Sequence, residues 1–172
     1  MIVVADASPL IFLGKLRQFD LLHRVLGPDV RVPRAVYHEL LVPAVEPAER
    51  QILETFLGRC RIEAVPHPGS FAKAMSAADN AVLTLAVRSK ADLLLCDERI
   101  TRTMAEAEGI RPLGTLGVLL RAMRQNILPA DETRRLVDRL VSVHNFRISI
   151  EVYQAALAEI SRGGAGGPGR RR

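Results

Sequence analysis

The first sixteen residues, MIVVADASPLIFLGKL, constrain the fold of this chain more than any other segment. Residues 2–4 form an unbroken apolar run without polar alternation, which indicates a strand covered on both faces, as in a parallel sheet. Asp6 follows this run, and Ser8 and Pro9 then begin an apolar pattern with helical spacing, with Ser8 as a candidate helix cap. Asp6 is therefore expected where a buried strand ends, at the edge where open α/β sheets bind ligands.

Strand-like runs return four more times, and helical patterns separate them. Residues 93–96 are a continuous apolar run and predict a strand, and residues 30–33, 61–65 and 110–113 predict three further short strands. Strands that alternate with helices favour a parallel sheet with right-handed crossovers. The last third of the chain has only helical patterns. We therefore expect an α/β fold, with a central parallel sheet of about five strands flanked by helices and with extra C-terminal helices.

The length of 172 residues, 48% of them hydrophobic, is enough for one domain with a substantial core. We assign residues 1–162 to this domain and include the C-terminal helices in it. The remaining segment, residues 163–172, has the low-complexity sequence GGAGGPGRRR. Its glycines and arginines offer almost no apolar surface to bury, so we expect this tail to be disordered.

The cysteines indicate a cytoplasmic protein, whereas the net charge says little about a nucleic-acid partner. The three terminal arginines carry 3 of the net charge of +5, which leaves +2 for the rest and only a weak indication of nucleic-acid binding. Cys60 and Cys96 lie in apolar contexts without metal-ligand spacing, as reduced thiols of a cytoplasmic protein do. The sequence shows no signal peptide and no apolar run of membrane-spanning length, so no membrane partner is expected.

Four acids occupy related places in this pattern. Asp6 and Asp97 each follow a buried strand, Glu39 lies about two turns into the helix after the second strand, and Asp79 begins the helix that leads to the fourth. If they converge at one sheet edge, four carboxylates repel each other unless a cation is present. Carboxylate oxygens suit Mg²⁺ or Mn²⁺, and such ions activate water and stabilise charge on a phosphodiester.

Each acid also has a structural explanation that the sequence leaves open. Asp6 fits a turn residue that binds nearby backbone N–H groups, and Glu39 fits a solvated helix position. Asp79 favours a helix N-terminus through the helix dipole, and Asp97 fits a cap of the following helix. Competing chemistries are poorly represented, because the chain has no phosphate-binding glycine motif and its four histidines lack zinc spacing.

Four segments resemble the PIN domain family of metal-dependent ribonucleases: VVADASPLI with Asp6, VPRAVYHEL with Glu39, SAADNAVLTLA with Asp79 and ADLLLCDE with Asp97. GIRPLGTLGVLLRAM and the later FRIS are similar to a subfamily often encoded as the toxin half of bacterial toxin–antitoxin pairs. The resemblance implies a PIN-like fold and hydrolysis of RNA with Mg²⁺ or Mn²⁺. It also implies that the four acids are both metal ligands and catalytic residues.

The resemblance further implies that Ser8 orients the acidic cluster, as a small hydroxyl residue does in many PIN domains. Four more residues are candidates for substrate contact: Lys15, Arg34, Glu98 and Arg102. For the last two, an ion pair between residues one helical turn apart is the structural alternative. Expected partners are RNA, a small antitoxin protein and, as a cover for the apolar C-terminal helices, a second copy of the chain.

Two other functions stay open at this point. The fold can be retained as a catalytically inactive module that binds nucleic acid or protein, and a metal-dependent phosphatase would use the same acids. Cleavage of RNA that needs Mn²⁺ and is lost in Asp6→Asn would separate the ribonuclease from the binding module.

Overall fold

The computed structural model describes residues 1–41 and 47–165 of the chain. Its five strands form one sheet in the order β3-β2-β1-β4-β5, and every neighbouring pair is parallel. This confirms the predicted α/β fold with a five-stranded parallel sheet. The strands are β1 (Val3–Ala5), β2 (Val30–Pro33), β3 (Arg61–Glu63), β4 (Leu93–Leu95) and β5 (Arg111–Leu113).

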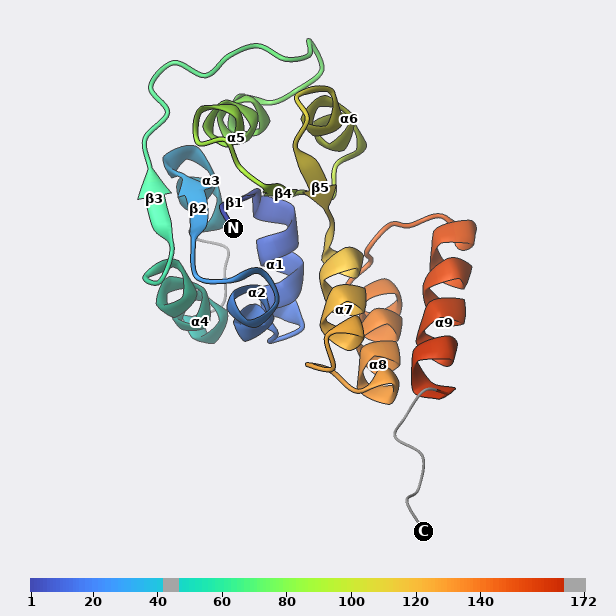
Figure 1. Ribbon diagram of the computed structural model, residues 1–172. Helices are drawn as coiled ribbons and strands as arrows, with labels where there is room; N and C mark the ends of the chain where they lie inside the picture. Colours follow the sequence, from blue (N-terminus) through green and yellow to red (C-terminus); the bar gives the residue numbers. More distant parts are fainter. Residues whose placement is uncertain (42–46, 166–172) are drawn as a thin grey trace. The chain divides into compact units, whose positions relative to one another are not determined.

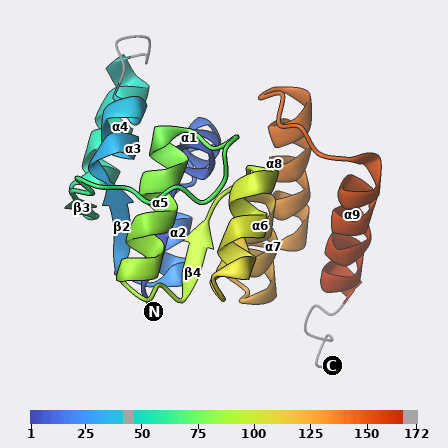
Figure 2. The ribbon, with the colours of Figure 1, turned by 90° about the horizontal axis from the view of Figure 1, so that it is seen from above.

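Helices follow or connect all of these strands. Figure 1 shows α5 and α6 on one side of the sheet and α1, α2 and α4 on the other, and Figure 2 looks down on the side of α5 and α6. Both faces of the sheet are covered, as the unbroken apolar strands require. The helices are α1 (Ala7–Lys15), α2 (Phe19–Leu26), α3 (Arg34–Leu40), α4 (Pro47–Leu57), α5 (Ala77–Arg88), α6 (Arg99–Ala107), α7 (Thr115–Arg124), α8 (Ala130–Ser142) and α9 (Ile150–Ala165).

The chain divides into two compact units, residues 1–115 and residues 116–172. The N-terminal unit contains the whole sheet and α1 to α6. In the C-terminal unit, α8 and α9 pack against each other. Apolar residues at helical spacing in α7 and α8 are buried: Leu116, Val118, Leu119, Leu136, Val137 and Leu140. Within the described part of the chain, no helix is long and apolar enough to span a bilayer.

Strand β1 lies at the centre of the sheet, and its side chains are completely buried. Its register sets Val3 beside Val30 of β2 and beside Leu93 of β4. The strand order reverses between β1 and β4. From β1 the chain first adds β2 and β3 on one side, and it then adds β4 and β5 on the opposite side. The carboxyl ends of β1 and β4 therefore flank the switch point at which open α/β sheets bind ligands.

The start of α1 differs from the prediction. Asp6, not Ser8, caps this helix, because the Asp6 Oδ1 atom accepts a hydrogen bond of 2.7 Å from the Ala7 N–H. The Asp6 N–H in turn donates to the Leu95 carbonyl at 2.9 Å, which continues the strand pairing beyond β1. The helix thus begins directly after the strand, and Ser8 is its second residue.

The end of α9 also differs, since the helix extends to Ala165 and so includes three residues of the segment expected to be disordered. Gly163 lies against Met123, whose Cε atom would be 3.0 Å from a Cβ at that glycine. The helix therefore continues packing through the first glycines instead of stopping at them. The rest of that segment, residues 166–172, lies outside the described residues.

Candidate active site

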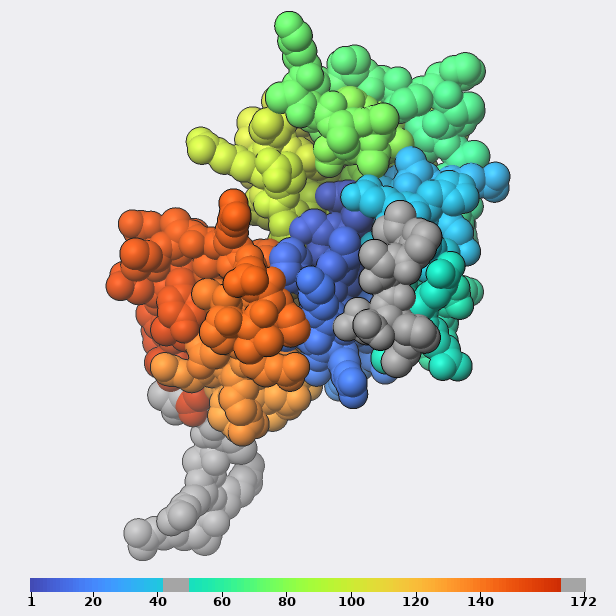
Figure 3. Space-filling view, turned by 180° about the vertical axis from the view of Figure 1, so that it is seen from behind, coloured from blue at the N-terminus to red at the C-terminus, as the bar shows by residue number. Residues whose placement is uncertain are grey.

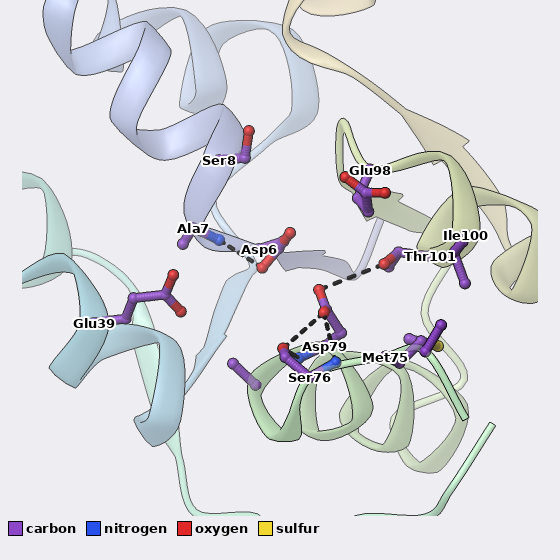
Figure 4. A pocket seen from close by; sticks show the side chains of 12 residues that line it. Asp6, Ala7, Ser8, Glu39, Met75, Ser76, Asp79, Glu98, Ile100 and Thr101 are labelled. Atoms are coloured by element: carbon purple, nitrogen blue, oxygen red, sulfur yellow. Dashed lines mark hydrogen bonds between the residues drawn. The ribbon is translucent and has the colours of Figure 1, made fainter. Parts of the chain in front are cut away.

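A cavity of about 300 Å³ lies at the carboxyl edge of the sheet in the N-terminal unit. Figure 4 shows Asp6, Glu39 and Asp79 pointing toward it from three different elements: the β1–α1 junction, α3 and the start of α5. The structure thus brings together three of the four acids named from the sequence. The lining residues are Asp6, Ala7, Ser8, Glu39, Ala74, Met75, Ser76, Ala78, Asp79, Glu98, Ile100 and Thr101.

Asp6 is the most buried acid of this site, with 6% of its surface exposed. Burial is the largest cause that raises the pKa of Asp6 from 3.8 to about 7. The hydrogen bond from the Ala7 N–H opposes this rise, and the negative charges of Asp79, Glu39 and Asp97 add to it. The four acids therefore act on one another electrostatically, and a cation in the cavity would stabilise the ionised form of Asp6.

Asp79 combines a structural role with a place in the cavity. It forms a capping box with Ser76, because the Ser76 Oγ accepts from the Asp79 N–H at 3.0 Å and the Ser76 N–H donates to Asp79 Oδ2 at 3.1 Å. The Ser76 hydroxyl also donates to Asp79 Oδ2 at 2.6 Å, and Thr101 Oγ1 donates to Asp79 Oδ1 at 3.4 Å. The helix-start explanation of Asp79 is therefore correct, and it does not remove the carboxylate from the cavity (Figure 4).

Glu39 is less restrained than Asp6 and Asp79. Its side chain is exposed, and among residues 1–41 and 47–165 no group donates a hydrogen bond to its carboxylate. Its neighbour Leu40 is buried and fixes α3 in the core. The helix is thus held by its apolar face while Glu39 remains available to a ligand.

Asp97 follows β4 but is not one of the residues that line the cavity. Its Oδ1 accepts from the Thr115 N–H at 2.7 Å, and its Oδ2 accepts from Thr115 Oγ1 at 2.6 Å and from Ser8 Oγ at 3.1 Å. Burial raises the pKa of Asp97, whereas the bonds from Thr115 and Ser8 and the charge of Arg102 lower it. Ser8 does line the cavity, so Asp97 adjoins the site through Ser8.

Sequence reasoning missed two residues that hold Asp97. Thr115 supplies two of the three hydrogen bonds to this carboxylate. Gly114 allows the close approach, because a Cβ at that position would lie 2.7 Å from Asp97 Oδ1. The available signal was their position directly after β5, at the same sheet edge as the acids.

The remaining candidates separate into those near the cavity and those away from it. Glu98 lines the cavity, whereas Arg102 donates to the Cys96 carbonyl at 3.3 Å. No ion pair between Glu98 and Arg102 occurs in the described structure, so that alternative is wrong. Lys15 lies over the Phe12 ring at the far end of α1, roughly 12 Å along the axis from its start. Arg34 lines a different groove.

The donor set of the cavity fits a hydrated divalent cation. Across the described ranges, no three carboxylate, imidazole or thiol groups gather closely enough to form a ready metal cage. Mg²⁺ does not need such a cage, because it keeps several waters and binds through one or two carboxylates. Asp6 Oδ2 and the Glu39 carboxylate, which accept no hydrogen bond in the described structure, are suitable ligands. The assignment of the four acids as ligands stays a prediction.

Comparison with known proteins agrees with this architecture. A sequence model described as PIN domain matches residues 2–162. Among solved structures, a PilT N-terminus domain protein from the hyperthermophilic archaeon Sulfolobus solfataricus P2 has the same fold, with a TM-score of 0.53 and 13% sequence identity. The match covers 69% of this chain and 90% of the archaeal chain. No curated protein matches the sequence.

Proposed function

Because the chain belongs to the PIN domain family, whose members are commonly nucleases, we propose that it is a Mg²⁺- or Mn²⁺-dependent endoribonuclease. The observation that carries this proposal is the convergence of Asp6, Glu39 and Asp79 on one cavity at the switch point of the sheet. Their mutual repulsion suits a site that gathers positive charge at neutral pH.

In this proposal, Asp6 and Glu39 would hold the hydrated cation, Asp79 would add its charge beside them, and Asp97 would contribute charge and orient Ser8. When bound, a divalent ion supplies a water nucleophile at neutral pH and neutralises charge on the phosphodiester. Burial raises the pKa of Asp6 to about 7, and a bound cation would favour the ionised form of this carboxyl group. Ser8 lines the cavity, and its hydroxyl donates to Asp97.

We further propose that the enzyme acts in the cytoplasm as the toxin of a toxin–antitoxin pair. Support comes from the toxin-type sequence segments described above and from two cysteines that are both free thiols. The partner would be a small antitoxin protein that blocks the acidic cavity, and the C-terminal helices offer a surface for a second copy. Co-expression with the product of the adjacent reading frame tests this part, which predicts a stable complex without ribonuclease activity.

Cleavage of total RNA by the purified protein tests the ribonuclease itself. Wild-type protein should cut RNA with Mn²⁺ or Mg²⁺ and not with chelator. Asp6→Asn and Glu39→Gln should each lose at least about 100-fold in rate, because a lost ligand costs at least as much as a lost outer-shell partner. Asp20→Asn, an exposed acid paired with Arg59 on the surface, is the matched control and should keep full activity. Equal rates for wild type and Asp6→Asn would refute the proposal.

A catalytically inactive binding module is the second candidate, and one observation favours it. Both oxygens of Asp97 already accept hydrogen bonds from protein donors, as in a site preserved for structure. The same experiment separates the two functions, since an inactive module binds RNA and leaves it intact with either metal.

A further inference from the structure

The N-terminal unit has a second groove on the other side of α3, with a volume of about 560 Å³. Its floor is apolar, since Leu57 is buried and Ile62 is half-buried. Cys60 belongs to the same floor, where burial raises the pKa of its thiol to about 12 and keeps it neutral. The lining residues are Arg34, Tyr37, His38, Glu54, Leu57, Gly58, Cys60 and Ile62.

The rim of this groove carries side chains suited to a nucleic acid. Arg34, Tyr37 and His38 lie at positions i, i+3 and i+4 of α3 and so share one helix face. The Tyr37 and His38 rings contact each other edge to face, with 5.7 Å between their centroids. In the described structure the Arg34 guanidinium and the Tyr37 hydroxyl have no hydrogen-bond or ion-pair partner. These groups therefore remain available to a ligand.

The same helix connects the groove with the acidic cavity. Glu39 enters the cavity from α3, as Figure 4 shows, while its neighbour His38 lines the groove. Their Cα atoms are about 3.8 Å apart because they are consecutive. In Figure 3, α3 (light blue) and α4 (turquoise) reach the surface on the same face of the N-terminal unit. The cavity and the groove are thus both lined by α3, through two consecutive residues.

We propose that this groove binds an unpaired nucleobase of the RNA strand, next to the phosphate held at the acidic cavity. Tyr37 is the stacking surface, because bases of single strands stack on aromatic side chains. Arg34 contacts the adjoining phosphate, as arginines do in most nucleic-acid complexes. Glu54 is paired with Arg50 at 3.0 Å, so these two charges offset each other and the apolar floor favours a base over a phosphate.

The proposal rests on the ribonuclease function above, and binding without cleavage tests it separately. The probe is a labelled ten-nucleotide single-stranded RNA with a 2-aminopurine base, bound to the full chain in chelator. Tyr37→Leu should weaken binding at least about five-fold and abolish the quenching of 2-aminopurine, whereas Tyr37→Phe should stay close to wild type. Arg34→Ala should weaken binding, and Arg24→Ala, an exposed arginine on α2, is the charge-matched control.

Each result decides one of the two proposals. Equal affinity of Tyr37→Leu and Tyr37→Phe, unquenched 2-aminopurine with wild type, or equal binding of duplex RNA would overturn the groove. If Tyr37→Leu does not fold, quenching by wild type and the comparison of Arg34→Ala with Arg24→Ala still decide it. Binding that depends on Tyr37 without any cleavage would support the groove and refute the nuclease. Cleavage by Tyr37→Leu with an unchanged KM would support the nuclease and refute the groove.

Discussion

Helix capping and burial have opposite effects on the charge of the Asp6 carboxylate. Its Oδ1 caps α1, which favours the charged form, while its burial among other acids disfavours that form. The second effect is larger, and it raises the pKa of Asp6 from 3.8 to about 7. Nearby carboxylates and burial thus prepare this residue for a cation, even though its local geometry is that of an ordinary helix cap.

This raised pKa predicts a pH dependence of the metal-free protein. Between about pH 4 and pH 7 the folded chain keeps the Asp6 proton and the unfolded chain has lost it, so stability falls as pH rises and levels off above about 7. Asp6→Asn retains a capping oxygen but cannot titrate. Over this pH range its free energy of unfolding should therefore fall by up to about 4 kcal/mol less than that of wild type. Urea unfolding in chelator at pH 4.5 and 7.5 measures both proteins. Identical pH dependence would contradict the prediction.

Asp97 depends on two neighbours for its orientation. Thr115→Val removes the hydroxyl that donates to Asp97 Oδ2 and should cost about 1–3 kcal/mol, with reduced RNA cleavage, whereas Thr115→Ser should restore both. Gly114→Ala places a Cβ 2.7 Å from Asp97 Oδ1 and should destabilise the fold by a similar amount. Thermal melts and cleavage rates of the three variants provide the comparison. Wild-type stability of Thr115→Val would show that this hydrogen bond contributes nothing.

At the scale of elements, the start of α5 allows capping to be separated from metal binding. Ser76→Ala breaks the capping box and should cost about 1 kcal/mol, equally with Mn²⁺ and with chelator. Asp79→Asn should in addition lose part of the rise in Tm that Mn²⁺ gives to wild type, because a negative charge of the cavity is lost. Melting curves of both variants, with metal and with chelator, test this. The same Mn²⁺ response in Asp79→Asn and wild type would leave Asp79 with its capping role alone.

The elements themselves were predictable because the pattern of apolar residues determines them. The central strands β1 and β4 are unbroken apolar runs and are completely or almost completely buried, whereas the edge strands β3 and β5 each begin with an exposed arginine. The sheet edge that carries the acids follows from parallel topology alone. The sequence could therefore indicate that Asp6 and Asp97 end neighbouring strands.

The details of the site depend on side-chain geometry that no local pattern encodes. Thr115 is a common helix-start residue, and nothing in its surroundings indicates that its hydroxyl reaches Asp97 from another strand. Arg102 and Glu98 have ion-pair spacing, yet the nearby Cys96 carbonyl binds the arginine instead. Lys15 is close to Asp6 in sequence but lies at the opposite end of a nine-residue helix. Closeness in sequence does not predict closeness in space here, because the length of the helix separates the two residues.

At the scale of the whole molecule, charge divides unequally along the chain. Residues 1–115 contain 14 basic and 14 acidic residues, so the net charge of +5 belongs entirely to residues 116–172. The unit with the acidic cavity therefore has no net attraction for a polyanion. If RNA is the substrate, much of the non-specific affinity must come from the arginines of the C-terminal unit and the tail.

The three terminal arginines allow this division to be measured. Each basic residue that contacts a single strand adds about 0.7 to the slope of log Kd against log salt, so replacing all three with glutamine should lower the slope by about 2. Three exposed basic residues of the N-terminal unit, Arg24, Arg88 and Lys90, form the matched control and should change it less. Both variants should have the same Tm as wild type, since exposed charges contribute little to the stability of the fold. An unchanged slope in the tail variant would show that the tail arginines do not touch RNA.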